Sequence, residues 1–229
     1  KIPPLEYEYL CFDQIRLNKE QGSLDEQRPR CESGALVIFF PGAGYRTDMP
    51  LLYYPMNHCL DLGMDTLSLN YNFKGIDTKD RQRRYEETLN SIEDLIAAAC
   101  HFSRYSKIAF MGKSLGTKFM ADVMKSSNQK VDLTLVSGSI WLTPLWNNHE
   151  SFETMLACDA SSLHIIGSLD PCYSVQLDRI LQESGKIVKV IDGADHGLDV
   201  PGDVNASIAI LGEVVAETCA VLGTFMNSD

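Results

Sequence analysis

A serine flanked by two glycines is the first group in this chain that could do chemistry. Ser114 lies in the stretch 112–116, GKSLG, which matches the pattern G-x-S-x-G. In that pattern the serine occupies a strained strand-to-helix turn, so the residues two before and two after it must be small. The apolar stretch 107–111 precedes the turn and the helix-like stretch 115–126 follows it. The segment therefore predicts a serine presented as a nucleophile.

The same residues also resemble the end of a phosphate-binding loop, G-x-x-x-x-G-K-[ST]. The first glycine of such a loop lets the backbone fold around the phosphates, but Lys107 stands at that position here. A second glycine-rich turn, at 42–44, lacks the third glycine of a dinucleotide fingerprint because Thr47 occupies its place. Both patterns disfavour nucleotide binding.

A serine hydroxyl needs a base to take its proton, and the base is usually a histidine oriented by a carboxylate. Asp170 follows the apolar stretch 162–168, and His196 lies in a turn after the stretch 186–192. The order Ser, Asp, His, with each residue at a strand end, is the order that accompanies a G-x-S-x-G turn. We therefore predict Ser114, Asp170 and His196 as the catalytic residues.

Each of these assignments has an alternative. Asp170 could cap the helix expected to begin near residue 172, and His196 could be a surface loop residue. Other carboxylates lie near the histidine in sequence, and Asp195 is badly placed because a direct neighbour rarely reaches the imidazole Nδ1. The rival carboxylates are Asp192, Asp195 and Asp199.

Two backbone N–H groups are needed to stabilise the oxyanion of a tetrahedral intermediate. One is expected from Leu115, at the start of a helix where N–H groups are free. The other is expected from the loop 41–45, PGAGY, with Ala43 as the preferred donor and Gly44 as the second choice. A simple glycine turn is the alternative for this loop.

Short apolar stretches alternate with helical ones after residue 35, which predicts an α/β fold with a mostly parallel sheet and helices on both faces. The expected strands are 35–40, 65–73, 107–111, 132–138, 162–168 and 186–192, and the expected helices are 51–62, 79–103, 115–126, 173–184 and 203–226. The stretch 6–31 alternates in part and turns at KEQG, which predicts antiparallel N-terminal edge strands. The segment between the strands 132–138 and 162–168 has room for one helix but not for a large cap, so we expect a single domain over 1–229.

Composition narrows the classes of partner. The formal net charge of −11 disfavours nucleic acid, because an acidic surface repels phosphates. The seven cysteines show no C-x-x-C pair and the five histidines no H-E-x-x-H pattern, so we expect no metal site and free thiols in a cytoplasmic protein. No uninterrupted apolar run approaches the length of a membrane span, so we expect no membrane segment.

Four ordered stretches, FFPGAGY, GKSLG, GSLDP and GADHGL, make the chain similar to the α/β-hydrolase superfamily, in its small, capless, dienelactone-hydrolase-like branch. The resemblance covers roughly 35–226 and implies Ser114 as nucleophile, Asp170 as acid, His196 as base, and Ala43 and Leu115 as oxyanion donors, with no cofactor. Two residues depart from the pattern. Pro41 stands where many relatives carry histidine, and the nucleophile is serine where dienelactone hydrolases use cysteine.

The expected activity is hydrolysis of a carboxylic ester or related acyl bond through an acyl-enzyme, on a small-molecule ester or thioester. A thioesterase or acyltransferase with the same residues, and a non-catalytic binding protein, are the alternatives. Lys113 is either a contact for an anionic substrate or a solvated strand-end residue, and Trp141 and Trp146 either line the site or pack elsewhere. The substrate-binding candidates are Gly44, Lys113 and Trp141. The oligomeric state is not indicated.

Overall fold

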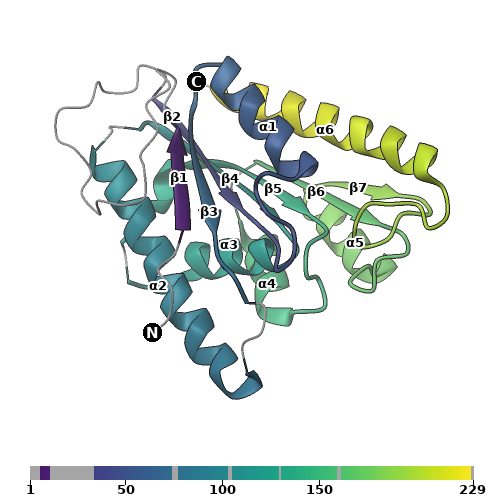
Figure 1. The fold of residues 1–229 in the computed structure, drawn as a ribbon, viewed down its shortest axis with the longest axis horizontal. Coiled ribbons are helices and arrows are strands. Elements are labelled where there is room, and N and C mark those ends of the chain that lie inside the picture. The colour runs from purple at the N-terminus through teal and green to yellow at the C-terminus, as the bar shows by residue number, and fades with distance from the viewer. Residues whose placement is uncertain are drawn as a thin grey trace.

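The computed structural model of the protein describes residues 6–10, 34–73, 77–102, 105–128, 130–158 and 161–227. Seven strands form one sheet in the order β1-β3-β2-β4-β5-β6-β7 (Figure 1). The strands are β1 (Glu6–Leu10), β2 (Ala35–Phe40), β3 (Asp65–Asn70), β4 (Lys107–Lys113), β5 (Val136–Leu142), β6 (Ser161–Gly167) and β7 (Ile187–Ile191).

Strands β2 to β7 pair in parallel, which confirms the prediction of a mostly parallel sheet. Strand β1 pairs antiparallel with β3 at the edge of the sheet, with Glu6 opposite Asn70. The rest of the segment for which antiparallel strands were expected, including the KEQG turn, lies outside the described residues. The parallel strands bring their carboxyl ends to one edge of the sheet, where the predicted site residues lie.

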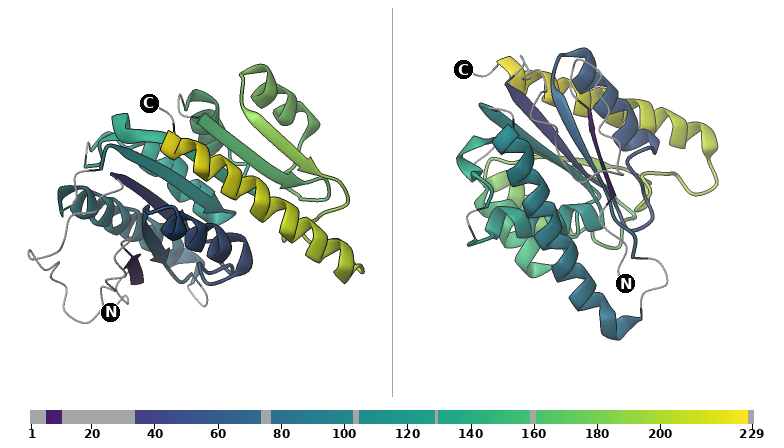
Figure 2. Two further views of the ribbon diagram at one scale, coloured as in Figure 1. Left: turned by 90° about the horizontal axis from the view of Figure 1, so that it is seen from above. Right: turned by 60° about the vertical axis from the view of Figure 1, so that its left-hand side comes forward.

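Helices cover both faces of the sheet (Figure 2). Residues of α1 (Pro50–Asp61) and α6 (Val204–Asn227) pack in the core on one face. Residues of α2 (Thr78–Phe102), α3 (Leu115–Lys125), α4 (His149–Ala157) and α5 (Val175–Glu183) pack in the core on the other. Between β5 and β6 the chain forms α4, which agrees with the expectation of one helix there.

Strand β2 shows why the sheet is buried on both faces. Its alternate side chains Leu36, Ile38 and Phe40 belong to the core beneath α2 and α3, whereas Val37 and Phe39 belong to the core beneath α1 and α6. All six of its residues are buried. A strand buried on both faces has a continuous apolar sequence rather than an alternating one, as ALVIFF does.

One predicted strand was misplaced. The expected strand at 132–138 begins at Val136 and continues to Leu142, after a 3₁₀ turn at Leu133–Leu135. The Asp132 carboxylate causes the delay, because it accepts hydrogen bonds from the Thr134 backbone N–H at 3.1 Å and from its hydroxyl at 2.6 Å. Local bonds of this kind favour a turn over a strand.

Helix α6 has a length and an apolar composition that a search for uninterrupted apolar runs does not reveal. By length and composition its stretch Val204–Thr224 could cross a membrane, with a mean hydropathy of 1.6 and 22% of that stretch buried. Glu213 and Glu217 interrupt the apolar run in the sequence, and both pair with Lys189 of β7, at 3.0 and 3.1 Å. The inward residues Val214 and Leu222 lie in the core, as in a helix that covers a sheet.

Candidate active site

Ser114 lies in a strained turn between β4 and α3. Its backbone angles are φ 52° and ψ −117°, and a positive φ is unfavourable for any residue with a side chain. The turn is tight because Gly116 lies directly against β2: a Cβ there would be 2.0 Å from the carbonyl oxygen of Phe40. A Cβ at Gly112 would be 2.3 Å from the Met120 sulfur. Gly116 is therefore required by the geometry that exposes the serine, and Gly112 leaves room for the Met120 side chain.

The three predicted catalytic residues form a continuous hydrogen-bonded chain. His196 Nε2 lies 2.8 Å from Ser114 Oγ, and His196 Nδ1 lies 2.7 Å from Asp170 Oδ2. The Asp170 side chain is fully buried, whereas 38% of the His196 side chain is exposed. The Asp170 backbone N–H donates to the carbonyl of Gly167, at the end of β6. The imidazole therefore bridges a buried carboxylate and a serine hydroxyl.

The loops that carry Asp170 and His196 are held together by their backbones. The Leu169 N–H donates to the Ala194 carbonyl at 2.9 Å. Gly167 permits this approach, because a Cβ there would be 2.1 Å from the Ala194 oxygen. The distance between Asp170 and His196 is thus fixed by this backbone contact between their two loops.

The rival carboxylates have other partners. Asp192 accepts a hydrogen bond from the Ser168 hydroxyl at 3.1 Å. Asp195 accepts from the N–H groups of Gly197 at 2.7 Å and Asp199 at 3.2 Å, which shapes the turn after the histidine. Asp170 is the carboxylate bound to the imidazole, as the sequence analysis expected.

The loop 41–45 lies against the turn of Ser114. A Cβ on Gly42 would be 3.5 Å from the Ser114 Cβ, and the Gly42 N–H donates to the Tyr45 carbonyl at 2.9 Å. The Tyr71 hydroxyl, just after β3, donates to the Pro41 carbonyl at 2.5 Å. Within this anchored loop Ala43 is exposed. Leu115 begins α3, where first-turn N–H groups have no intrahelical acceptor.

Solved structures share this arrangement of strands and helices. Est1E from Butyrivibrio proteoclasticus superimposes with a TM-score of 0.64 at 12% identity, over 98% of this chain and 95% of its own. An α/β serine hydrolase without a lid from Xanthomonas campestris gives 0.57 at 12% identity, over 99% and 89%. Dienelactone hydrolase from Anabaena variabilis gives 0.52 at 14% identity, over 80% and 84%.

The chain has an α/β-hydrolase fold. This confirms the resemblance on which the sequence analysis relied. No family model and no curated protein matches the chain. At these identities the structural likeness concerns the fold, and the chemistry of the chain depends on the geometry of its own site.

Lys113 is not a solvated residue of this α/β-hydrolase fold. It is 3% exposed, and its ammonium donates to the carbonyl oxygen of His196 at 2.9 Å and to the Thr143 hydroxyl at 3.1 Å. It also lies 4.9 Å from the centre of the Tyr45 ring. Burial lowers the pKa of Lys113 to about 8, although Asp170 and the nearby acidic loop act to raise it. The lysine thus links the nucleophile turn, the histidine loop and the loop 41–45.

Trp141 does not line the site. The strand β5 continues past Gly138 to Leu142, so Trp141 lies inside the sheet and is fully buried. Its indole N–H donates to the Ser139 hydroxyl at 2.8 Å, and its ring stacks on His164 with centroids 5.7 Å apart. Trp146 is 1% exposed and also packs in the core. The core alternative of the sequence analysis holds for both tryptophans. Gly44, the other candidate contact, is exposed in the loop 41–45.

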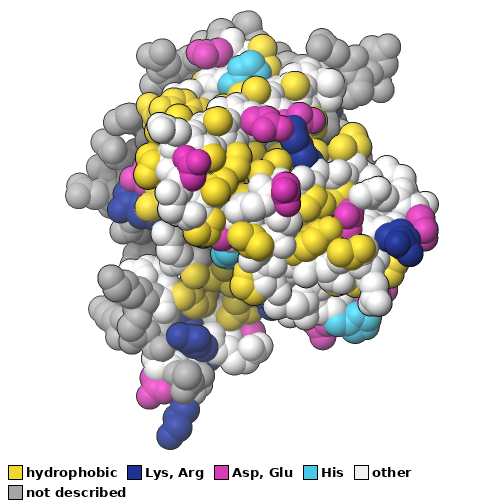
Figure 3. All heavy atoms as spheres, turned by 90° about the vertical axis from the view of Figure 1, so that its right-hand side faces the viewer, with side chains coloured by type: hydrophobic (Ala, Val, Ile, Leu, Met, Phe, Trp, Pro, Cys, Tyr) yellow, Lys and Arg dark blue, Asp and Glu magenta, His cyan; other side chains and the backbone are white. Residues whose placement is uncertain are grey.

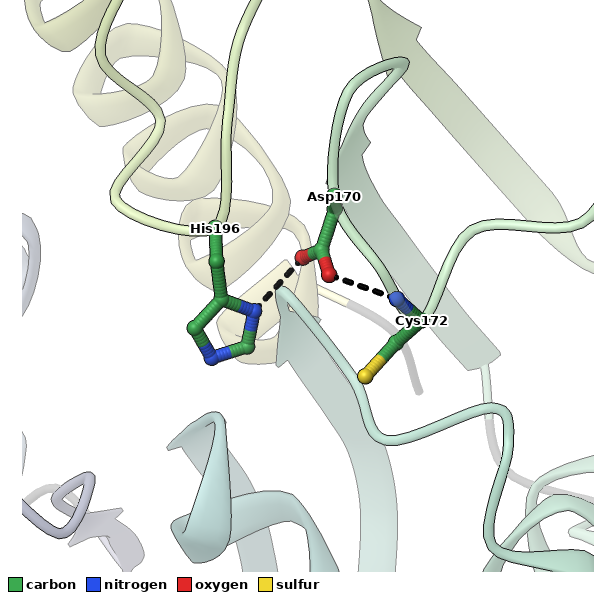
Figure 4. A group of neighbouring side chains, drawn as sticks. All are labelled: Asp170, Cys172 and His196. Atoms are coloured by element: carbon green, nitrogen blue, oxygen red, sulfur yellow. Dashed lines mark hydrogen bonds and ion pairs between the residues drawn. The ribbon is translucent and has the colours of Figure 1, made fainter.

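Cys172 is a neighbour of the site that the sequence did not indicate. Its backbone N–H donates to Asp170 Oδ1 at 2.8 Å, so both carboxylate oxygens of Asp170 have partners (Figure 4). Asp170, Cys172 and His196 offer three possible metal-ligand atoms within 4.8 Å of one another. Burial, and then Asp170, raise the pKa of the Cys172 thiol to about 11, so the thiol is protonated at neutral pH. Because Asp170 Oδ2 is paired with His196 Nδ1 and Asp170 Oδ1 with the Cys172 N–H, the arrangement is that of a supported Ser-His-Asp chain.

Proposed function

We propose that this chain is a serine hydrolase that cleaves carboxylic esters through an acyl-enzyme. The observation that carries the proposal is the chain of two short hydrogen bonds from Ser114 through His196 to the buried Asp170. The strained backbone of Ser114 supports it, since such strain at a polar residue clusters at functional sites.

In the proposed acylation step, His196 Nε2 accepts the Ser114 proton as Oγ attacks the carbonyl carbon. Asp170 keeps the Nδ1 proton on the imidazole and stabilises the imidazolium. The N–H groups of Ala43 and Leu115 are the proposed donors to the oxyanion. His196 then protonates the leaving alcohol, and the acyl group remains on Ser114.

In the proposed deacylation step, His196 takes a proton from water, which attacks the acyl carbon and releases the acid. The exposed part of His196 gives water a route to the base, while the buried Asp170 stays unavailable to solvent. A thiol ester would react by the same steps, and an acceptor other than water would give acyl transfer.

Labelling with a fluorophosphonate probe tests the proposal. We expect the purified protein to be labelled and to hydrolyse p-nitrophenyl acetate. Ser114→Ala should abolish labelling and lower kcat by about 10³-fold or more. Ser184→Ala is the matched control, because Ser184 is an exposed serine at the end of α5. Equal labelling of Ser114→Ala would rule the proposal out.

Hydrolysis and acyl transfer are separated by the choice of substrate. Wild-type protein given p-nitrophenyl esters and acyl-CoA of the same acyl group should prefer the oxygen ester and form the free acid. A higher kcat/KM for the thioester, or product that depends on an added acyl acceptor, would favour the thioesterase or acyltransferase alternative.

A further inference from the structure

A cavity of about 510 Å³ opens between the start of α1, the start of α6 and the loop that follows His196. This volume is within the usual range of small-molecule sites. Its wall includes Tyr45, Leu51, Gly197, Leu198, Ile208 and Leu211.

The cavity adjoins the candidate active site through shared residues. Gly197 follows His196 directly, and Tyr45 ends the loop that carries the proposed oxyanion donor. The ammonium of Lys113 connects the two walls, since it contacts the Tyr45 ring and the His196 carbonyl. The cavity therefore lies against the two loops that carry His196 and the proposed oxyanion donor.

The wall of the cavity is mostly apolar. Leu51 and Leu198 form buried parts of it, while Ile208 and Val204 leave 62% and 73% of their surface exposed at its edge. Leu198 has a positive φ of 65°, which is unfavourable for leucine and is held by the turn around Asp195. An apolar group placed in the cavity would remove this surface from water, which is favourable.

The charges at the cavity are negative. Among the described residues that line it, the charged ones are Asp199 and Asp203. Asp203 caps α6 by accepting the Ala206 N–H at 2.9 Å, and Asp199 is exposed. On the face of the molecule shown in Figure 3, acidic side chains lie among hydrophobic ones. An anionic group would be repelled here, whereas a neutral one would not.

We propose that this cavity binds an uncharged apolar part of the substrate, so that the chain acts on neutral esters that carry an aliphatic chain or an aromatic ring. This inference rests on the proposed serine hydrolase function and names its substrate class. It replaces the expectation of an anionic substrate contacted by Lys113, because two of the ammonium donors are directed to acceptors within the protein.

The test is a chain-length profile. Two substrate series are used: p-nitrophenyl esters of increasing acyl length and acetates of increasing alcohol length. In one of them, kcat/KM of the wild-type protein should rise by about threefold to fourfold for each added methylene, as long as the aliphatic group of the substrate still fits the cavity. Ile208→Trp narrows the cavity, and the hexanoate to acetate ratio, or the hexyl to methyl ratio, should fall about tenfold or more.

Ala209→Trp is the matched control, because Ala209 is exposed on the same turn of α6 and does not line the cavity. Its ratios should equal those of the wild type. If Ser114 is labelled but both series give the same profile in all three proteins, the cavity proposal is wrong and the hydrolase proposal stands. If no ester is cleaved and Ser114 is not labelled, the hydrolase proposal itself fails.

The charge of the cavity has its own test. Wild-type protein should cleave p-nitrophenyl pentanoate at least about tenfold faster than the hemisuccinate, which is of similar size but anionic. Asp199→Asn should narrow this difference. A wild-type preference for the hemisuccinate would overturn the assignment of a neutral substrate.

Discussion

Two buried basic side chains, on β4 and β6, lie in opposite surroundings. Lys113, at the carboxyl end of β4, donates to the His196 carbonyl and the Thr143 hydroxyl. His164, in the middle of β6, is fully buried, and neither ring nitrogen has a hydrogen-bond partner among the described residues. Burial lowers the pKa of both side chains, to about 8 for Lys113 and to about 3 for His164.

The difference between Lys113 and His164 shows that a buried polar group can hold neighbouring loops in place only when it has hydrogen-bond partners on them. At the edge of the sheet the ammonium joins three loops that carry candidate site residues. In the core, the His164 ring stacks on Trp141 and lies near the Trp146 ring, and among the described residues it makes no hydrogen bond that would hold a loop. Partnered buried groups specify an arrangement, whereas unpartnered ones chiefly lower stability. Mutations at the edge should therefore lower activity as well as stability, whereas replacement of His164 in the core should leave activity unchanged.

The largest effect is expected from Gly116→Ala, which would disrupt the packing of the Ser114 turn against β2 at the edge of the sheet. Its Cβ would overlap the Phe40 carbonyl oxygen at 2.0 Å, and backbone cannot rotate away. We expect a loss of more than about 3 kcal/mol in the free energy of unfolding, or no soluble protein, together with loss of activity. Urea denaturation measures it.

Gly112→Ala is the paired control for this prediction. Its Cβ would meet the sulfur of Met120, the far part of a flexible side chain, so the variant should lose less, about 1–3 kcal/mol. Equal losses in the free energy of unfolding for the two variants would show that the contact of Gly116 with the backbone of β2 is no more restrictive than the contact of Gly112 with a side chain.

Lys113→Met should lower kcat about 10-fold to 100-fold while KM changes little, because His196 loses a donor that holds its backbone. The free energy of unfolding should fall by about 1–3 kcal/mol, since two acceptors lose their partner. The ammonium is charged below pH 8 and neutral above it, so wild-type kcat should fall as pH rises through about 8. Asp170, Asp195, Asp199 and the Tyr45 ring are the groups that face it.

This pH response distinguishes positioning from simple packing. In Lys113→Met the decline near pH 8 should be absent, while any decline that arises from other groups persists. An unchanged pH profile, or a higher KM with the same kcat, would contradict a positioning role for Lys113.

The same contrast explains how far the sequence could predict the site. The proximity of Ser114, Asp170 and His196 could be predicted because parallel strands bring their carboxyl ends to one edge, and because the order of the three residues is visible in the sequence. The burial of Lys113 could not, because it depends on the histidine loop and Tyr45 folding over the strand end. A lysine next to a turn looks solvated when only its sequence neighbours are known.

The strand boundaries show a second limit. Local hydrogen bonds of Asp132 begin a turn where apolar residues alone suggested a strand, and the strand then extends past Gly138. That shift moves Trp141 from a presumed loop into the core. Apolar composition predicts that a strand exists more reliably than where it begins.

The interior region should be sensitive to acid. His164 has a pKa of about 3 in the folded protein, against about 6.5 when unfolded, so below pH 6.5 the unfolded chain binds a proton that the folded chain does not. This contribution to stability is complete above pH 6.5 and is lost by up to about 1.4 kcal/mol per pH unit as pH falls toward 3. Urea midpoints between pH 7 and 4.5 measure the slope.

Two variants test the cause of this slope. His164→Phe cannot bind the proton, and His149→Phe is the control because it alters a side chain that is 86% exposed. The slope should decrease in the first variant and remain in the second. If the wild type and both variants lose stability equally as the pH falls, the difference in proton binding by His164 between the folded and unfolded states is not the cause of the acid sensitivity.

The smallest effect is expected from His164→Phe at pH 7. Phenylalanine keeps an aromatic face against Trp141 and removes two buried nitrogens that have no partner among the described residues. Replacing a buried polar group with an apolar one of similar shape is nearly neutral or stabilising, so the free energy of unfolding should change by less than about 1 kcal/mol or rise. Ester turnover should stay at the wild-type level, because His164 lies in the core and, among the described residues, makes no hydrogen bond to Ser114, Asp170 or His196. A large loss of stability would mean that the imidazole makes a stabilising polar interaction in the core. His164 and Lys113 would then differ in where they lie and not in whether they have hydrogen-bond partners.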